Sequence, residues 1–293
     1  MDSQKIIGTQ LISPMRQREW SWPAVANFVL GGAGAGFYLL SVFNMILERE
    51  RSIMIYPVSF GMLAPVLMGL GFTLLITEAG RPSRSRYVLF HLQRAWISRE
   101  TLAFAFFAPA VIFDHCFPHP IFKVFAALSA LFFMVAQGFI LYSSRALPAW
   151  NVSIIPIFFI SSGLASGAGL ALLLAASGRL VIEGGLELLS MACIIWNLIV
   201  WFFYLQWSNT IDFRSAIKAL YRPLIMLISI VFGHAFPILI LLLLQIPAFP
   251  EMGKMFQGVF AMVSGLAIIT GVTAQKASIV LSSGFTRKIT LKC

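Results

Sequence analysis

Charge is scarce in this sequence of 293 residues, of which only 11% are Asp, Glu, Lys or Arg while 59% are hydrophobic. The mean hydropathy is +0.88. A soluble globular domain of this composition could not cover its surface with polar groups. The apolar residues form runs long enough to cross a bilayer as helices. The sequence therefore predicts an all-α integral membrane protein.

Cysteine and histidine are also rare, which argues against several kinds of redox centre. The three cysteines, Cys116, Cys193 and Cys293, lie far apart, so neither a disulfide framework nor a CxxC metal site is expected. Only His234 of the four histidines lies within an apolar run, whereas a bis-histidine haem needs two histidines on facing helices. We expect no haem or metal in this chain and interpret the segment DHCFPHP, which begins at Asp114, as an interhelical turn.

Acidic residues are scarcer than basic ones, which gives a net charge of +10. The basic residues lie in short loops between apolar runs, which is the pattern of membrane topology, so no nucleic-acid partner is expected. The first apolar run is too long for the core of a signal peptide, and we expect it to remain as a span.

The apolar runs predict eight helices, with a long arginine-rich connection between the second and the third. That connection extends from Glu78 to Glu100, and loops of this size usually have a function. The eight predicted helices are Trp22–Leu47, Ile55–Thr77, Thr101–Phe117, Ile121–Tyr142, Ser153–Ala176, Leu186–Trp207, Leu224–Ile246 and Met255–Ala274.

A weak internal repeat divides the chain into halves. The segment GGAGAG at Gly31–Gly36 is similar to SGLASG at Ser162–Gly167, and Gly32 with Gly36 forms a GxxxG face for close helix packing. An even number of helices in each half predicts two parallel four-helix bundles. The predicted divisions are a polar segment at 1–19, a first bundle with the site at 20–145, a second bundle at 146–276, and a basic tail at 277–293.

Three segments resemble the NrfD/PsrC-type membrane subunits of polysulfide-reductase-like complexes. The first begins at Trp20 and reads WSWPxxxxFxxGGxxAG. The second is the arginine-rich connection, with Glu78, Gly80, Arg81 and Pro82 and then Trp96–Glu100. The third is Pro156 together with Ser161–Gly169.

The resemblance implies an eight-helix anchor that binds a quinone, either ubiquinone or menaquinone. It also implies an iron–sulfur partner subunit that exchanges electrons with the quinone site, and a catalytic subunit that is commonly molybdopterin-dependent. The family's fourth helix often carries Tyr-Thr-Gly facing the quinone, where this chain has Ala136, Gln137 and Gly138. Tyr142 lies farther along the same helix.

Polar residues at the ends of several predicted helices should meet at one membrane face. A quinone site needs polar groups for the two oxygens and a group that moves protons. We expect Asn27 and Gln137 to bind the quinone oxygens and Glu78 to accept protons. The other candidate quinone-binding residues are Tyr142, Trp96, Arg81 and His91.

Other interpretations of these residues stay open. Glu78 and Arg81 could form an interfacial salt bridge, and His91 could be a loop histidine. Asn197, Gln206, His234 and Gln245 lie within predicted spans and could serve packing or a water path. A two-repeat transporter would need polar midplane residues in both halves, but the residue that corresponds to Asn27 in the second half is Phe158. A structural anchor without quinone is the third alternative.

The distribution of basic residues predicts the orientation in a bacterial-type inner membrane. With eight spans both termini share one side, and an excess of Lys and Arg there places them in the cytoplasm. The competing explanation is that these residues bind an acidic partner on the outer side. The residues counted on that side are Lys5, Arg16, Arg18, Arg81, Arg84, Arg86, Arg94, Arg99, Arg145, Arg214, Lys218, Arg222, Lys276, Arg287, Lys288 and Lys292.

Overall fold

Long apolar helices form almost all of the structure. It is a computed structural model that describes residues 10–47, 61–78, 80, 82–176, 184–246, 254–287 and 289–290. In these residues, 7 helical spans are long and apolar enough to cross a membrane, and one shorter apolar helix joins them. The prediction of an all-α membrane protein is therefore confirmed. The helices are α1 (Trp22–Leu47), α3 (Leu63–Glu78), α4 (Trp96–Cys116), α5 (Pro120–Tyr142), α6 (Ile155–Ala176), α7 (Gly184–Leu205), α10 (Phe236–Leu244) and α11 (Lys254–Ala277).

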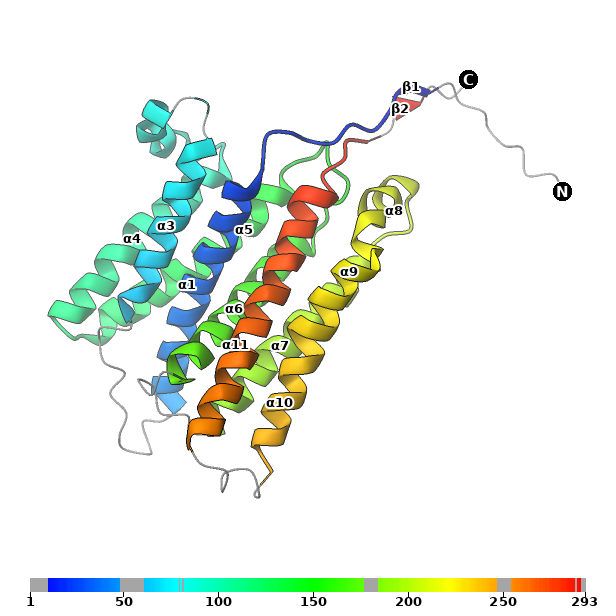
Figure 1. Cartoon of the computed structure of the whole chain (residues 1–293). Helices are drawn as coiled ribbons and strands as arrows, with labels where there is room; N and C mark the ends of the chain where they lie inside the picture. The colour runs from blue at the N-terminus through cyan, green and yellow to red at the C-terminus, as the bar shows by residue number, and fades with distance from the viewer. Residues whose placement is uncertain are drawn as a thin grey trace.

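Short elements connect these helices (Figure 1). The predicted second helix begins outside the described residues, and α3 is its described part. The remaining elements are β1 (Gln10–Ile12), the 3₁₀ helices η2 (Pro82–His91) and η3 (Lys218–Tyr221), α8 (Ile211–Ile217), α9 (Pro223–Met226), the π-helices η4 (Leu227–Ala235) and η6 (Ser278–Ser282), and β2 (Ile289–Thr290).

Two predicted helices differ in detail from the observed ones. Helix α4 begins at Trp96 rather than at Thr101, so the last residues of the arginine-rich connection are helical. The predicted helix Leu224–Ile246 is a composite of α9, η4 and α10, with π-helical geometry in the middle. Pro237 explains the change of geometry, because its ring lacks an N–H and conflicts with the carbonyl four residues earlier.

The two glycine-rich motifs pack against each other where α1 meets α6. A Cβ atom at Gly36 would lie 2.0 Å from the Gly163 carbonyl oxygen, and one at Gly167 would lie 2.3 Å from the Phe37 nitrogen. Side chains are therefore excluded, and the two backbones touch. Helix α1 also packs against α3, α5 and α11, and α6 packs against α5, α7 and α11, so these two helices form the centre of the described bundle.

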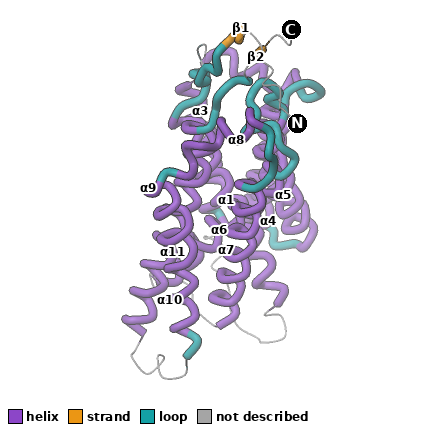
Figure 2. The backbone as a smooth tube through the Cα atoms, turned by 90° about the vertical axis from the view of Figure 1, so that its right-hand side faces the viewer, coloured by secondary structure: helices purple, strands orange, loops and turns teal. Residues whose placement is uncertain are grey.

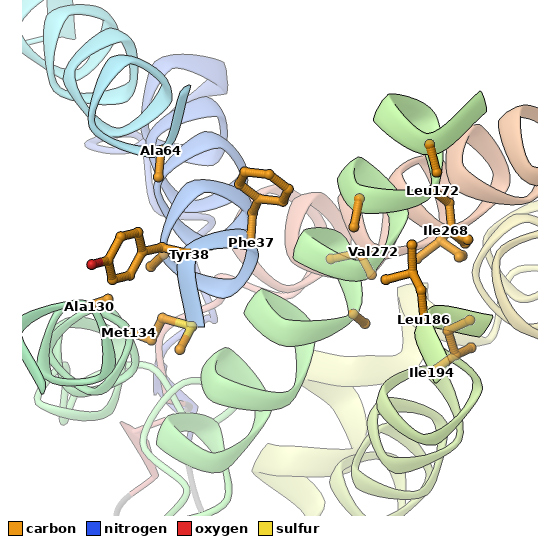
Figure 3. Close-up of a cluster of buried hydrophobic side chains, with 14 of the residues drawn as sticks. Phe37, Tyr38, Ala64, Ala130, Met134, Leu172, Leu186, Ile194, Ile268 and Val272 are labelled. Carbon is orange, nitrogen blue, oxygen red and sulfur yellow. The ribbon is translucent and has the colours of Figure 1, made fainter. Parts of the chain in front are cut away.

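Apolar side chains fill the space on both sides of this contact (Figure 3). Tyr38 of α1 lies toward Ala130 and Met134 of α5, and Leu172 of α6 lies with Ile268 of α11. Large apolar side chains are also exposed on the outer helix faces, for example Phe106, Leu128 and Leu239. Such an outer surface suits lipid rather than water.

Both ends of the described chain lie at the same end of the bundle. Strand β1 pairs with β2 in antiparallel fashion, and Arg16 forms an isolated bridge with Phe285 (Figures 1 and 2). Helices α1 and α4 begin at this end, and α3 and α5 finish there (Figure 1). The predicted site residues on these four helices therefore belong to one end of the bundle.

Candidate functional site

A buried carboxylate, Glu100 of α4, joins three helices at this end. Its side chain is 0% exposed. One oxygen, Oε1, accepts hydrogen bonds from Asn27 Nδ2 of α1 and from Gln137 Nε2 of α5, both at 3.0 Å. Gln137 Nε2 also donates to the Asn27 carbonyl oxygen at 3.3 Å. The structure thus brings Asn27 and Gln137 together, as expected, but around an acid that the sequence analysis did not select.

The other side-chain oxygens of this cluster have no partner. Asn27 Oδ1, Gln137 Oε1 and Glu100 Oε2 are buried without a hydrogen bond. Both amide nitrogens face Glu100, which fixes the two amide oxygens as the unpaired atoms. A buried acceptor without a donor is unfavourable. The cluster is therefore suited to a ligand, or to water, that donates hydrogen bonds.

A buried lysine approaches the same cluster from the second half of the chain. Lys276 of α11 is 0% exposed, and its Nζ donates to the Phe28 carbonyl oxygen at 2.7 Å. The absence of a side chain at Gly32 makes room for it, because a Cβ there would lie 2.6 Å from Lys276 Nζ. The same Cβ would lie 3.7 Å from Gln137 Oε1. Lys276 and Gln137 thus flank one small notch in α1.

This position corrects the sequence analysis, which counted Lys276 among the loop cations that report topology. The lysine lies within a candidate membrane span, and Nζ also lies 5.4 Å from the centre of the Phe159 ring. Across the described ranges, the single ion pair is Lys123 with Asp114 at 3.2 Å. Glu100 and Lys276 are therefore a buried acid and a buried base that form no ion pair with each other and that both lie near Gln137.

Glu78 closes α3 and caps the start of α1. Its carboxylate accepts hydrogen bonds from the backbone N–H of Ser21 and, at 3.1 Å, from that of Ala24. Acidic side chains are favoured at this place because the first N–H groups of a helix lack partners and carry partial positive charge. The capping contacts account for this acid structurally, and its proton-accepting role stays a prediction.

The remaining predicted residues lie around the cluster. Trp96 stacks on Phe139 at 4.4 Å with an interplanar angle of 17°, and the Arg99 guanidinium lies 4.1 Å from the centre of the Trp96 ring. Tyr142 packs its edge on Phe139, with ring centres 5.7 Å apart. These aromatic residues therefore form a packed layer at the start of α4 and the end of α5.

The arginine-rich connection supplies a surface pocket beside this layer. His91 is exposed. Together with the other residues from Leu89 to Arg94, it lines a pocket of about 540 Å³. Arg81 lies outside the described residues. Arg99 fastens the connection to α4 by donating from Nε to Leu92 O at 2.8 Å.

No group of three or more His, Cys, Asp or Glu side chains in the described part of the chain is placed to hold a metal ion. In the segment DHCFPHP, His119 caps α5 by accepting a hydrogen bond from the Ile121 N–H at Nδ1, at 3.2 Å. Asp114 forms the ion pair with Lys123. This part of the chain has the contacts of an interhelical turn.

One family of known proteins matches the chain. The sequence model described as DMSO reductase anchor subunit (DmsC) matches residues 15–207. No curated protein gave a match. The matched range contains Asn27, Glu78, Glu100 and Gln137, whereas Lys276 lies beyond it. The match is to a membrane-anchor family of the same broad kind as NrfD/PsrC, not to NrfD/PsrC itself.

Proposed function

The chain belongs to the DMSO reductase anchor subunit family, and from this premise we propose that it is the quinone-reactive membrane anchor of a multi-subunit oxidoreductase. The observation that carries the proposal is the buried Glu100 carboxylate with unpaired acceptor oxygens around it. A quinol donates hydrogen bonds through its two hydroxyl groups, so its chemistry fits a set of acceptors. The quinone is ubiquinone or menaquinone, as the resemblance implied.

A quinol bound at this end of the bundle would supply two electrons and two protons. The chain's own residues would hold and receive the protons. Asn27 and Gln137 hold Glu100 Oε1 by donating to it, which leaves Oε2 as the oxygen that can take up a proton. General bases are effective when they are positioned within hydrogen-bond reach of the proton that they abstract. We therefore assign the proton-accepting role to Glu100 rather than to Glu78, whose carboxylate caps α1.

The aromatic layer and the connection would form the entrance to the site. Trp96 and Glu100 are separated by about one turn on the same face of α4, because residues i and i+4 align in an α-helix. A ring that enters beside His91 and Arg94 would therefore meet Trp96 before Glu100. Phe90, which is 78% exposed on the same connection, offers an apolar contact for a partner.

The partners would be an iron–sulfur subunit and a catalytic subunit, commonly a molybdopterin enzyme. The iron–sulfur subunit would dock on the end of the bundle that carries η2, because electron transfer requires it to lie close to the quinone. The excess of basic residues at this end supports a cytoplasmic location for it under the positive-inside rule. Removing Lys276 from the count of loop cations leaves the direction of that bias unchanged.

The experiment compares Glu100→Gln with Glu78→Gln in the assembled complex in native membranes. Oxidation of a quinol analogue by the Glu100→Gln complex should fall by about 10²-fold or more, the usual contribution of a positioned base. The Glu78→Gln complex should keep most of its turnover, because an amide oxygen can still accept from the α1 backbone.

Retention of the iron–sulfur subunit on the membrane is the control for assembly. If the Glu100→Gln complex keeps wild-type turnover and the Glu78→Gln complex loses it, Glu78 rather than Glu100 is the proton acceptor. Saturable inhibition by a quinone analogue separates the quinone-reactive anchor from a structural anchor, which such an analogue would leave unaffected.

A further inference from the structure

A second buried polar chain lies in the other half of the bundle, built from His234 of η4, Asn197 of α7 and Ser161 of α6. All three side chains are 0% exposed. The His234 Nε2 atom lies 2.8 Å from Asn197 Oδ1, and Asn197 Nδ2 donates to Ser161 Oγ at 3.1 Å. Ser161 Oγ in turn donates to the Phe158 carbonyl oxygen at 3.1 Å. The other ring nitrogen, His234 Nδ1, faces the Ser229 carbonyl oxygen.

These partners determine where the protons of the ring must lie. A backbone carbonyl only accepts, so Nδ1 must carry a proton. The Ser161 hydroxyl gives its proton to the Phe158 carbonyl and therefore accepts from the Asn197 NH₂ group, which leaves Oδ1 to face the histidine. With the Asn197 amide placed this way, Oδ1 only accepts, so Nε2 would carry a proton as well. This placement of the amide therefore matches an imidazolium, with a proton on both ring nitrogens.

A second arrangement satisfies the same atoms with one proton fewer. If Nε2 loses its proton, the Asn197 amide can turn over so that Nδ2 donates to Nε2 and Oδ1 faces Ser161. The Ser161 hydroxyl then rotates from the Phe158 carbonyl to Asn197 Oδ1. The amide oxygen and nitrogen are nearly equal in size, so this exchange needs little movement of the surrounding helices.

We propose that His234, Asn197 and Ser161 form a buried proton-binding site that takes up and releases one proton as the Asn197 amide turns over. The step is a proton transfer between a water molecule and Nε2, and no electrons move. The proposal does not depend on a quinone, and it rests on the buried contacts of His234 with Asn197 and Ser229 and of Asn197 with Ser161. Nothing in the family match assigns it, because His234 lies beyond the matched residues.

The surroundings favour a proton that is held temporarily rather than a permanent charge. Within the described part, no carboxylate is bonded to the ring, and a buried charge without a counter-ion is unfavourable. Glu187 is bonded to Gln245, Tyr204 donates to the Ala149 carbonyl, and Lys276 donates to the Phe28 carbonyl. The titratable residues on the helices packed against η4 are Glu187, Cys193 and Tyr204 on α7, and Lys254 and Lys276 on α11.

Unpaired polar atoms on η4 and α11 are suitable hydrogen-bond partners for the water that delivers the proton. Helices η4 and α11 touch where a Cβ at Gly233 would lie 2.4 Å from the Gly271 Cα. The two helices run in opposite directions, so Ser229 and Gln275 both lie about one turn from this contact in the same direction. Ser229 Oγ and both amide atoms of Gln275 are buried without partners. Buried water commonly satisfies such groups.

The π-helical geometry of η4 contributes to this arrangement. A π-helical hydrogen bond joins residues i and i+5, which is the spacing of Ser229 and His234. The backbone and the ring of His234 therefore both face the turn that contains Ser229. Replacement of the π-turn by regular helix would move Ser229 off the ring nitrogen. Besides the effect of Pro237, the contact between Ser229 and His234 thus depends on the π-helical geometry of η4.

The test is nitrogen-15 NMR of the full-length protein in liposomes, with histidine as the labelled residue. His91, His115 and His119 are exposed, and replacing all three by glutamine leaves His234 as the single labelled histidine. We expect both ring nitrogens to carry protons in acidic buffer and Nε2 to lose its proton reversibly in alkaline buffer. In an Asn197→Leu background this reversible change should be lost, because the turning amide that satisfies both states is gone.

The control is Ser129→Ala, which removes a buried hydroxyl bonded only within its own helix, to the Phe125 carbonyl. It should leave the His234 titration unchanged. A His234 ring that keeps one protonation state over the whole range in which the helices remain folded would overturn the proposal. An unchanged titration in the Asn197→Leu protein would equally overturn it, because the amide would then have no part in binding the proton.

Discussion

The buried lysine gives the sharpest test of how the two halves of the chain depend on each other. Lys276→Met keeps an unbranched side chain, one atom shorter, but removes the amino group and its hydrogen bond to Phe28 O, which is 2.7 Å long. Removing one member of a buried charged pair typically costs about 3–5 kcal/mol, because the other charge is left uncompensated. Glu100 is the opposite charge that shares the Gln137 neighbourhood with Lys276.

The size of the expected coupling follows from the shared neighbourhood of the two residues. No direct ion pair joins Glu100 to Lys276, and residues of one polar network typically couple by about 0.5–3 kcal/mol, so we expect a coupling of about 2 kcal/mol. Lys276→Met should therefore destabilise the wild-type background by about 3 kcal/mol. In a Glu100→Gln background the same change should destabilise by about 2 kcal/mol less, because no buried carboxylate is left behind.

The assay is a double-mutant cycle on reversible unfolding in mixed detergent micelles, followed by helical circular dichroism. Lys123→Met is the matched control, because its partner Asp114 lies 3.2 Å away in a pair that is 28% and 12% exposed. A partly exposed pair of this kind should contribute about 1 kcal/mol or less. Additive effects of Lys276→Met and Glu100→Gln, within about 0.5 kcal/mol, would refute the electrostatic link between the halves.

Three further changes test the helix contacts and the topology. Gly36→Ala should destabilise the bundle by about 1–3 kcal/mol in thermal unfolding, because the added methyl meets the backbone of α6; Gly69→Ala, whose Cβ would lie an ordinary 3.6 Å from Phe104, should not. Glu78→Ala should destabilise the start of α1 by about 1 kcal/mol in the same assay, whereas Glu78→Gln should keep most of the cap. Alkaline phosphatase fused after Cys293 should be inactive if the C-terminus is cytoplasmic, and activity would place it outside.

The sequence predicted the parts of the fold that depend on local pattern. Long apolar runs identified the spans, and the glycine motifs identified a contact face that the structure shows between Gly36 and Gly163. Asn27 and Gln137 stood out because amides within apolar runs need partners. Each of these signals is local, since it depends on residues within one helix.

The two buried charges were missed because their surroundings are not local. Glu100 was assigned to the end of a loop, since the start of α4 at Trp96 is marked by no helix-capping side chain at Ala95. Lys276 was assigned to the basic end of the chain, where the positive-inside pattern expects lysines. The notch at Gly32, on a helix at the other end of the sequence, accommodates the buried amino group of Lys276. A single sequence does not reveal which distant glycine lies opposite a lysine.

The second half of the chain does not repeat the polar site of the first half. The residue that corresponds to Asn27 is Phe158, which packs edge-on against Phe159 and beside Trp201 in an aromatic core. The second half nevertheless contributes a polar group near the Glu100 cluster of the first half. Helix α11 packs against α1 and α6, and its Lys276 reaches the Gly32 notch. A site attributed to the first four helices thus depends on the last helix of the chain. Because the contact between α1 and α6 holds the halves in register, any change that separates these helices should disturb Lys276 and the Glu100 cluster together.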